Sequence, residues 1–404
     1  MTVPLSSVVK HSPKPAMVIP KLLYFCYFAA MASVTPFLAL YYKQVGLSGR
    51  QIGLLASLSP LVALLAAPFW GGLADATQQH RRLLLLAISC FLLAVFGLSF
   101  ATTLLWLIPL VVAFAFFRAP IMPLVDNSVL EALGARKQEY GKQRLWGAIG
   151  WGVSAALIGS ITERYGLGWA FYGCILIMSV NLFGATRLTI SHAQIGSNFW
   201  KNLRYFVTSW PWLIFLSTVF VNGIGMSFTN NFLFLYMSSL HASKTLMGFA
   251  LFAASLSELP AFFFSDRLLR RWGSRGLLIA ALLAQATRMF AYAAMPSPWF
   301  VLLINLLHGL TFSAMWVAAV NYTNEHAPVG LGATAQGVLS GLSMGLAGMV
   351  GALIGGVLYD SVGPAAMFAC GGVLTLLGFS FFTIAGRMAP PTKISPEMVG
   401  VGED

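Results

Sequence analysis

The 404 residues of this chain are 58% hydrophobic and only 9% charged, and their mean hydropathy is positive. Soluble globular domains carry about a quarter charged residues, so this composition excludes a soluble globule and indicates that lipid surrounds most of the chain. The excess of 24 Lys and Arg over 12 Asp and Glu is scattered between apolar runs, which is typical of membrane topology and not of nucleic-acid binding.

Apolar stretches of about twenty residues, the length that crosses a bilayer as an α-helix, recur along the chain. The first follows a polar segment without a clear small-residue cleavage site, so we expect a spanning helix and not a removed signal peptide. The first six predicted helices cover residues 20–42, 51–74, 83–101, 104–131, 144–162 and 167–187. Six more are predicted at 210–238, 245–265, 276–296, 298–325, 332–358 and 364–387.

This pattern predicts an all-α membrane protein with twelve transmembrane helices in two pseudo-symmetric six-helix bundles. We assign residues 1–187 to the N-terminal bundle, 188–209 to a cytoplasmic central loop, and 210–404 to the C-terminal bundle and tail. Seventeen Lys and Arg lie at the termini and in the loops on their side, against four on the other side. Positive charge is enriched on the cytoplasmic side, so we expect a multi-pass protein of the plasma (cytoplasmic) membrane with both termini in the cytoplasm.

The two halves repeat one another in sequence. Gly159 and Glu163, near the end of the fifth predicted helix, recur as Gly356 and Asp360 at a spacing of 197 residues. Parallel repeats of this kind place a substrate site between the halves, near the bilayer midplane.

Twelve helices, a central loop and a Gly-x-x-x-Asp turn that ends at Asp75 together resemble the major facilitator superfamily over essentially the whole chain. The resemblance implies gating roles for Asp75, Arg81 and, at the corresponding turn of the second half, Asp266. In the superfamily Arg and Gly follow the Asp directly, whereas here five residues separate Asp75 from Arg81. Two interpretations remain open for Asp75: a helix cap or a pair with Arg81 or Arg82 on the cytoplasmic face, and an ordinary solvated turn charge.

A narrower resemblance lies in the fourth and fifth helices. The segments from Phe117 to Asp126 and from Tyr140 to Trp151 are similar to the lactose permease and nucleoside symporter branch, including phenylpropionate-permease-like proteins. In the lactose permease a carboxylate, an arginine and a tryptophan at the positions of Asp126, Arg144 and Trp151 hold the sugar. The resemblance therefore implies that these three residues bind substrate.

The second half matches the same branch only in part. Glu258, Arg288 and His308 stand where the permease has its galactoside-binding Glu, its helix-nine Arg and its His. Thr311 replaces the proton-bearing Glu three residues after the His, and Asn305 replaces the Lys three residues before it. The permease's proton relay therefore cannot be copied onto this chain.

Four ionisable residues lie well inside predicted helices: Arg118, Asp126, Glu258 and Arg288. Each isolated charge at a helix centre costs roughly 2.5 to 3.5 kcal/mol, so we expect all four to face the protein interior. The helices of Asp126 and Arg144 adjoin, so we expect these two side chains to pair in the substrate cavity. We expect Glu258, close to Arg288, to be the principal proton carrier, with Asp126 as the second candidate. Arg118 and Arg288 are either structural counterions of the acids or substrate contacts.

Three further substrate candidates each have a structural alternative. His308 is either a hydrogen-bonded interior histidine or a ligand. Trp151 is either an interfacial anchor or a stacking platform. Asn230 shares a helix face with Asn222, and interhelical hydrogen bonds explain the two as well as contacts with substrate hydroxyls do.

The sequence contains no Walker loop, HExxH helix or G-x-S-x-G elbow, so we expect no enzymatic activity, no cofactor and no metal site. We predict a secondary active transporter working by alternating access, with proton-coupled symport of a sugar or nucleoside as the preferred function. Three interior or rim arginines against two interior acids favour, as the alternative, a proton-coupled carrier of an organic, aromatic anion. A receptor or membrane enzyme on the same scaffold is a third hypothesis. The expected partners are a small-molecule substrate, protons and the lipid bilayer, without nucleic acid, and the chain is expected to act as a monomer.

Overall fold

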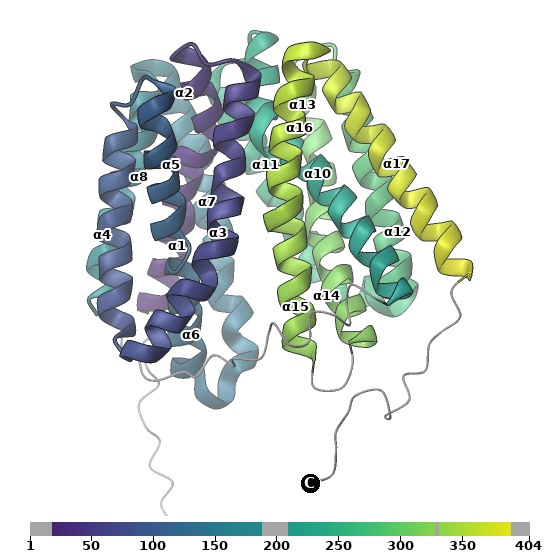
Figure 1. Cartoon of the computed structure of the whole chain (residues 1–404), viewed down its shortest axis with the longest axis horizontal. Helices are drawn as coiled ribbons and strands as arrows, with labels where there is room; N and C mark the ends of the chain where they lie inside the picture. The colour runs from purple at the N-terminus through teal and green to yellow at the C-terminus, as the bar shows by residue number, and fades with distance from the viewer. Residues whose placement is uncertain (1–17, 188–208, 328–330, 389–404) are drawn as a thin grey trace, which may run out of the picture.

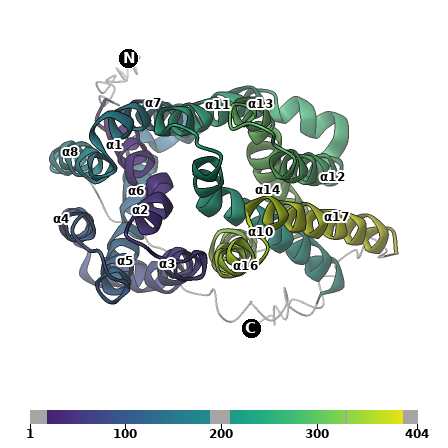
Figure 2. The same ribbon diagram turned by 90° about the horizontal axis from the view of Figure 1, so that it is seen from above.

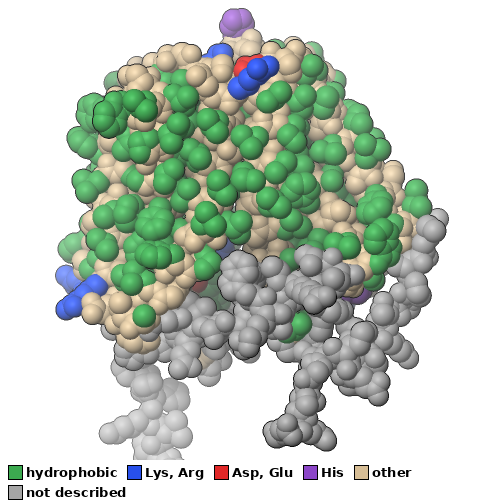
Figure 3. Space-filling model, viewed as in Figure 1, with side chains coloured by type: hydrophobic (Ala, Val, Ile, Leu, Met, Phe, Trp, Pro, Cys, Tyr) green, Lys and Arg blue, Asp and Glu red, His purple; other side chains and the backbone are tan. Residues whose placement is uncertain are grey.

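The computed structural model describes residues 18–187, 209–327 and 331–388, and the regular secondary structure within these ranges consists of helices joined by turns. Twelve helical spans in this part of the chain are long and apolar enough to cross a membrane. Figure 3 shows hydrophobic side chains spread over the middle of the face drawn, with charged groups near its ends. This distribution fits a chain whose sides contact lipid and whose ends contact water.

The first half contains six spans, of which the first and fourth are each divided. They are α1 (Val18–Val34), η1 (Thr35–Phe37) and α2 (Leu38–Gln44); α3 (Gly49–Thr77); α4 (His80–Leu98); α5 (Leu104–Arg118) and α6 (Ile121–Leu133); α7 (Tyr140–Tyr165), preceded by η2 (Gly134–Glu139); and α8 (Gly168–Ala185).

The second half repeats this plan. Its elements are α10 (Trp210–Ser239); α11 (Lys244–Phe263); α12 (Ser265–Ala293); α13 (Phe300–Ile304), η3 (Asn305–Leu307), η4 (Gly309–Ala314) and α14 (Met315–His326); α15 (Gly332–Ser340), η5 (Gly341–Leu346) and α16 (Ala347–Ser361); and α17 (Pro364–Met388).

The twelve predicted spans are confirmed, with one clear difference in boundary. The ninth was expected to begin at 276, but α12 begins at Ser265. Its backbone breaks at Gly273, where φ is +66°, a value that glycine adopts without steric cost. Ser265–Trp272 is therefore a separate helical piece ahead of the span, too rich in arginine to be recognised as apolar. The predicted loop 188–209 lies, except for Ser209, outside the described residues.

The two bundles lie side by side, with α1 to α8 in one and α10 to α17 in the other (Figures 1 and 2). Since twelve spans bring the start of α1 and the end of α17 to the same end of the molecule, we name that end the terminal face. The other end is named the opposite face.

Glycines allow the bundles to approach closely near the opposite face. A Cβ on Gly53 of α3 would lie 2.5 Å from the carbonyl oxygen of Ala352 on α16. A Cβ on Gly248 of α11 would lie 2.3 Å from the carbonyl oxygen of Ala155 on α7. Only glycine fits at such distances, so two equivalent backbone contacts join the halves.

Beside each glycine contact, a carboxylate from one half caps a helix of the other. Asp360 accepts hydrogen bonds from the backbone N–H groups of Gly49 and Arg50, both at 2.8 Å. Glu163 accepts one from the backbone N–H of Lys244 at 2.5 Å. The first N–H groups of a helix lack partners within the helix and carry positive partial charge, so a carboxylate there is stabilising. The 197-residue repeat thus marks the contacts that close the opposite face.

Candidate substrate and proton-coupling sites

The fourth span is broken at Ala119 and Pro120, and Asp126 lies on the short helix α6 that follows the break. Proline has no backbone N–H to continue the hydrogen-bond ladder, so α5 ends at Arg118 and α6 starts anew. The break brings Asp126 next to α1 and α7.

Asp126 forms the centre of a polar cluster in the first half. Its Oδ2 lies 3.6 Å from a guanidinium nitrogen of Arg144, and its Oδ1 accepts a hydrogen bond from the hydroxyl of Tyr24. Arg144 also donates to the hydroxyl of Tyr140 at 3.5 Å, and its guanidinium carbon lies 5.6 Å from the ring centre of Phe28. The Arg144 and Asp126 side chains are 48% and 25% exposed, so the pair borders solvent-accessible space. The expected ion pair is confirmed, whereas substrate binding by the pair stays a prediction.

Arg118 and Trp151 lie close to this cluster but do not form its ion pair. The guanidinium carbon of Arg118 lies 5.4 Å from the ring centre of Phe114, and Arg118, Asp126 and Arg144 all interact electrostatically with Tyr27. Asp126 pairs with Arg144, so the hypothesis that Arg118 is its direct counterion is not supported. Trp151 is half-buried against the larger hydrophobic core, and its role as a platform stays a prediction.

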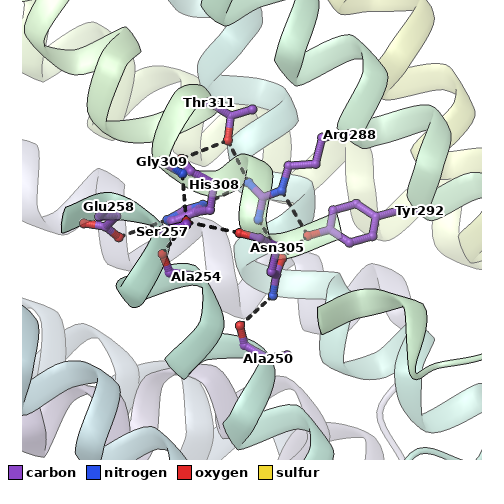
Figure 4. A network of polar contacts seen from close by, with 10 residues as sticks. All are labelled: Ala250, Ala254, Ser257, Glu258, Arg288, Tyr292, Asn305, His308, Gly309 and Thr311. Carbon is purple, nitrogen blue, oxygen red and sulfur yellow. Dashed lines mark hydrogen bonds and ion pairs between the residues drawn. The ribbon is translucent and has the colours of Figure 1, made fainter. Parts of the chain in front are cut away.

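A second polar cluster lies in the other half, where Glu258 of α11 faces the tenth span (Figure 4). Glu258 Oε1 lies 3.2 Å from His308 Nε2, and His308 Nδ1 lies 2.9 Å from a guanidinium nitrogen of Arg288. The expectation that Glu258 and Arg288 pair directly is wrong, because the imidazole of His308 lies between them. His308 therefore joins a part-exposed acid to a cation that is only 1% exposed.

Donor and acceptor chemistry assigns the protonation state of His308 in this arrangement. A guanidinium can only donate, so His308 Nδ1 must accept from Arg288 and carries no proton. The proton of a neutral imidazole then sits on Nε2 and is donated to the carboxylate of Glu258. In this state His308 is neutral and bridges Arg288 and Glu258.

The remaining partners of Arg288 are neutral oxygens. Its guanidinium donates to Tyr292 Oη at 3.1 Å, to Asn305 Oδ1 at 3.0 Å and to Thr311 Oγ1 at 3.0 Å. Asn305 is held in turn by its own donation to the carbonyl of Ala250 at 2.7 Å. The cation is therefore satisfied without a carboxylate, and the two replacements seen in sequence at 305 and 311 are both its ligands.

The backbone of the tenth span is irregular where it carries this network. A 3₁₀ turn covers Asn305–Leu307, and a π-helical segment covers Gly309–Ala314. Gly309 donates its N–H to Ser257 Oγ at 3.0 Å, and a Cβ on it would lie 2.0 Å from the carbonyl oxygen of Ser257. Single π-helical turns inside longer helices occur frequently at functional sites, which agrees with the position of His308 at this junction.

Asn230 is set apart by its exposure on a buried helix. Its helix, α10, has the largest buried share of the twelve spans, at 72%. Between Ile214 and Met237, Asn230 is the one exposed residue. Asn222, which was expected on the same face, is 7% exposed and packs inside the bundle. Asn230 thus stays a substrate candidate, while Asn222 is buried.

The three expected gating residues lie at the terminal face. Position 75 falls within α3, but the side chain of Asp75 lies outside what the structure describes. Arg81 donates to the carbonyl of Thr186, one residue past the end of α8, so it caps a helix of its own half. Asp266 is exposed in the first turn of α12, where the helix dipole favours an acid. Gating roles for these residues stay predictions.

Sequence reasoning missed Tyr24, Tyr140 and Tyr292 as members of the two clusters. Tyr292 follows Arg288 by four residues, a spacing that places two side chains on one helix face and could have revealed it. Tyr140 precedes Arg144 by the same spacing, whereas Tyr24 carries no such signal, because it meets Asp126 only through the fold.

Comparison with known proteins agrees with this geometry. A family model described as the MFS_1 like family matches residues 18–370. The maltose permease of Geobacillus stearothermophilus is 30% identical over 361 residues, which are 88% of this chain and 91% of that protein. The probable 3-phenylpropionic acid transporter of Escherichia coli (strain K12) is 24% identical over 384 residues, covering 91% of this chain and 96% of the relative.

A solved structure supports the same fold. A variant of the nucleoside transporter NupG matches with a TM-score of 0.83 over 91% of this chain and 98% of that chain, at 14% identity. With twelve membrane-spanning helices in two repeated bundles and a family match over most of its length, the chain belongs to the MFS_1 like family and is a membrane transporter of the major facilitator superfamily.

Proposed function

We propose that this chain is a proton-coupled symporter of a small polar solute, a sugar or a nucleoside, and that it works by alternating access between its halves. The observation that carries this proposal is the part-exposed pair of Asp126 and Arg144. A carboxylate accepts and a guanidinium donates, so together they can bind two neighbouring hydroxyl groups of one solute. The similarity to a maltose permease over most of the chain supports a solute of this kind.

Aromatic side chains lie around the Asp126–Arg144 pair. Tyr24 and Phe28 of α1 flank the Asp126–Arg144 pair, and Trp151 lies two turns further along α7. Flat aromatic faces suit the apolar faces of a sugar ring or a nucleobase. Asn230, exposed on a central helix of the other bundle, would supply hydroxyl contacts from the second half.

The second cluster supplies the coupling in this proposal, with Glu258 as the proton carrier. Protonation of Glu258 removes its negative charge and so weakens the hydrogen bond that it accepts from the Nε2–H of His308. The imidazole is then free to turn away from Arg288, which changes the contacts between α11, α12 and the tenth span. Since Arg288 is satisfied by neutral oxygens, it remains in place while Glu258 and His308 change partners.

The conformation described is closed at the opposite face, where Asp360 and Glu163 cap helices across the halves. We assign the terminal face to the cytoplasm because the excess of Lys and Arg lies there, with residues 188–209 as the central loop between bundles 1–187 and 210–404. The transporter would then face inward in this state. We assign it to the plasma membrane as a monomer whose partners are solute, protons and lipid.

One observation favours a second function, transport of an aromatic anion. A relative of similar length is described as a probable 3-phenylpropionic acid transporter, and Arg144 lies against the ring of Phe28. The charge of Arg144 is already balanced by Asp126, however, and a free carboxylate would be repelled by that acid. A thermal-shift screen of sugars, nucleosides and aromatic acids separates the two functions.

The coupling is tested in proteoliposomes that contain the full chain and a solute found in that screen. Glu258→Gln is expected to retain exchange of solute across the membrane and to lose accumulation driven by an imposed pH gradient. Glu139→Gln is the control, since Glu139 is a part-exposed acid of the first half, 3.9 Å from Arg136 and outside the Glu258 cluster. Full accumulation by Glu258→Gln would contradict the proposal and point to Asp126 as the carrier.

A further inference from the structure

A groove with a volume of about 380 Å³ lies on the second bundle, beside the cluster of Glu258, His308 and Arg288. Its walls come from the end of α11, the start of α12 and the tenth span. The lining is apolar, with Pro260, Phe264, Leu306 and Leu310 among it, except for Ser257 and Arg267.

The outer wall of the groove continues an apolar stripe on the tenth span. Leu306 and Leu310 are 53% and 40% exposed, and Leu303 and Trp299, on the same helix face, are 65% and 66% exposed. Figure 2 places α11 and α13 along one edge of the molecule, away from α10. A large apolar stripe at the edge of a membrane protein faces lipid, so the groove opens to the bilayer.

The other end of the groove reaches the terminal face at Arg267, on the short helical piece Ser265–Trp272. The break at Gly273 separates this piece from the rest of α12. Beside it, the turn from α11 to α12 carries three consecutive phenylalanines, residues 262–264, that are 44%, 81% and 45% exposed. Aromatic belts and basic amphipathic helices mark the interface between lipid and water, so Arg267 lies at headgroup depth.

We propose that this groove binds an anionic phospholipid. The acyl chain lies along Pro260, Leu306 and Leu310, and the phosphate contacts Arg267. Residues 265–275 carry four arginines against the single acid Asp266, so the headgroup region favours negative charge. A zwitterionic lipid brings a cation to the same place and is therefore held less strongly.

A lipid in the groove would contact the residues that hold the coupling cluster in place. Ser257, on its inner wall, donates to the carbonyl of Asn305 at 3.2 Å and accepts from the N–H of Gly309 at 3.0 Å. These bonds hold the irregular part of the tenth span, with His308 between Asn305 and Gly309. A chain seated in the groove packs against this segment, so an anionic lipid stabilises the arrangement around His308.

The test is native mass spectrometry of the full-length protein with phosphatidylglycerol or phosphatidylcholine of the same acyl chains. The wild type is expected to retain phosphatidylglycerol preferentially. Arg267→Gln should weaken that retention about fivefold, the effect of one basic residue near an anionic headgroup. Arg271→Gln removes the same charge from the same helical piece without lining the groove, so it should weaken retention less. Leu306→Trp should lower retention of both lipids by filling the groove.

Three outcomes would overturn the proposal. These are equal retention of the two lipids by the wild type, equal losses in Arg267→Gln and Arg271→Gln, and displacement of the lipid by glycerol phosphate at equal concentration. The last would show that a soluble anion site, and not the apolar groove, accounts for binding. Unchanged helicity of each variant by circular dichroism separates these outcomes from misfolding.

Discussion

Each half of the molecule contains an acid and an arginine inside its helices, but the two clusters are built differently. In the first half, Arg144 is 48% exposed and contacts Asp126 at 3.6 Å. In the second half, Arg288 is 1% exposed and meets Glu258 only through His308. Exposed ion pairs contribute little stability and are readily exchanged for other partners, whereas a buried cation depends on every bond that it makes. The first cluster is therefore suited to admit a solute, and the second to transmit a change in protonation.

The largest expected effect is on the free energy of unfolding, which the arginines of the two clusters should affect differently. Arg288→Met leaves the oxygens of Asn305 and Thr311 and a nitrogen of His308 without their donor, so it should destabilise the protein by at least about 3 kcal/mol. Arg144→Met, the matched change in the exposed cluster, should cost less than about 1 kcal/mol. Thermal unfolding of the purified proteins in detergent measures both, and equal losses would contradict the comparison.

A smaller effect tests whether neutral oxygens hold the buried cation. Thr311→Val removes one acceptor of Arg288, and a hydrogen bond to a charged group contributes about 1.5 to 3 kcal/mol. Thr218→Val is the control, because Thr218 is equally buried and its hydroxyl bonds only the carbonyl of Ile214 at 2.8 Å. Chemical denaturation should show a greater loss for Thr311→Val; a greater loss for Thr218→Val would mean that the charge of Arg288 is not what matters.

Substitutions in the exposed cluster of Asp126 and Arg144 should change solute affinity and leave protein stability nearly unchanged. Arg144→Lys keeps the charge but loses the planar fork, so solute affinity should fall roughly tenfold while the unfolding temperature changes little. Arg164→Lys, on the exposed last turn of the same helix, provides the control. Calorimetric titration measures the affinity, and an unchanged value in Arg144→Lys would indicate a purely structural role.

The smallest predicted effect concerns Tyr24, which holds one oxygen of Asp126. Tyr24→Phe removes this hydrogen bond and should weaken solute binding about threefold, within the range for a single neutral donor. Tyr41→Phe removes a hydroxyl that bonds the carbonyl of Ala101 at 2.9 Å, away from the cluster, and should leave binding unchanged. If both variants bind equally well, Tyr24 does not position Asp126 for the solute.

The number of spans and their repeat were predictable from sequence alone. An apolar stretch of about twenty residues satisfies its backbone in lipid only as a helix, so composition determined twelve helices. The cost of a charge in lipid likewise identified Asp126, Glu258 and Arg288 as interior residues. The 197-residue spacing of Glu163 and Asp360 was also visible, although its role in joining the halves was not.

What the sequence by itself determined, then, is which residues lie in helices and which of them must avoid lipid. Only the tertiary structure decided which side chains meet: His308 lies between Glu258 and Arg288, and Tyr24 bonds Asp126. It also decided that the arginine is exposed in one cluster and buried in the other. The reason is geometric. A spacing of 3.6 residues per turn sets the face of a single helix, but the rotation and depth of that helix against its neighbours depend on packing between segments far apart in the chain, such as Tyr24 and Asp126, 102 residues from one another.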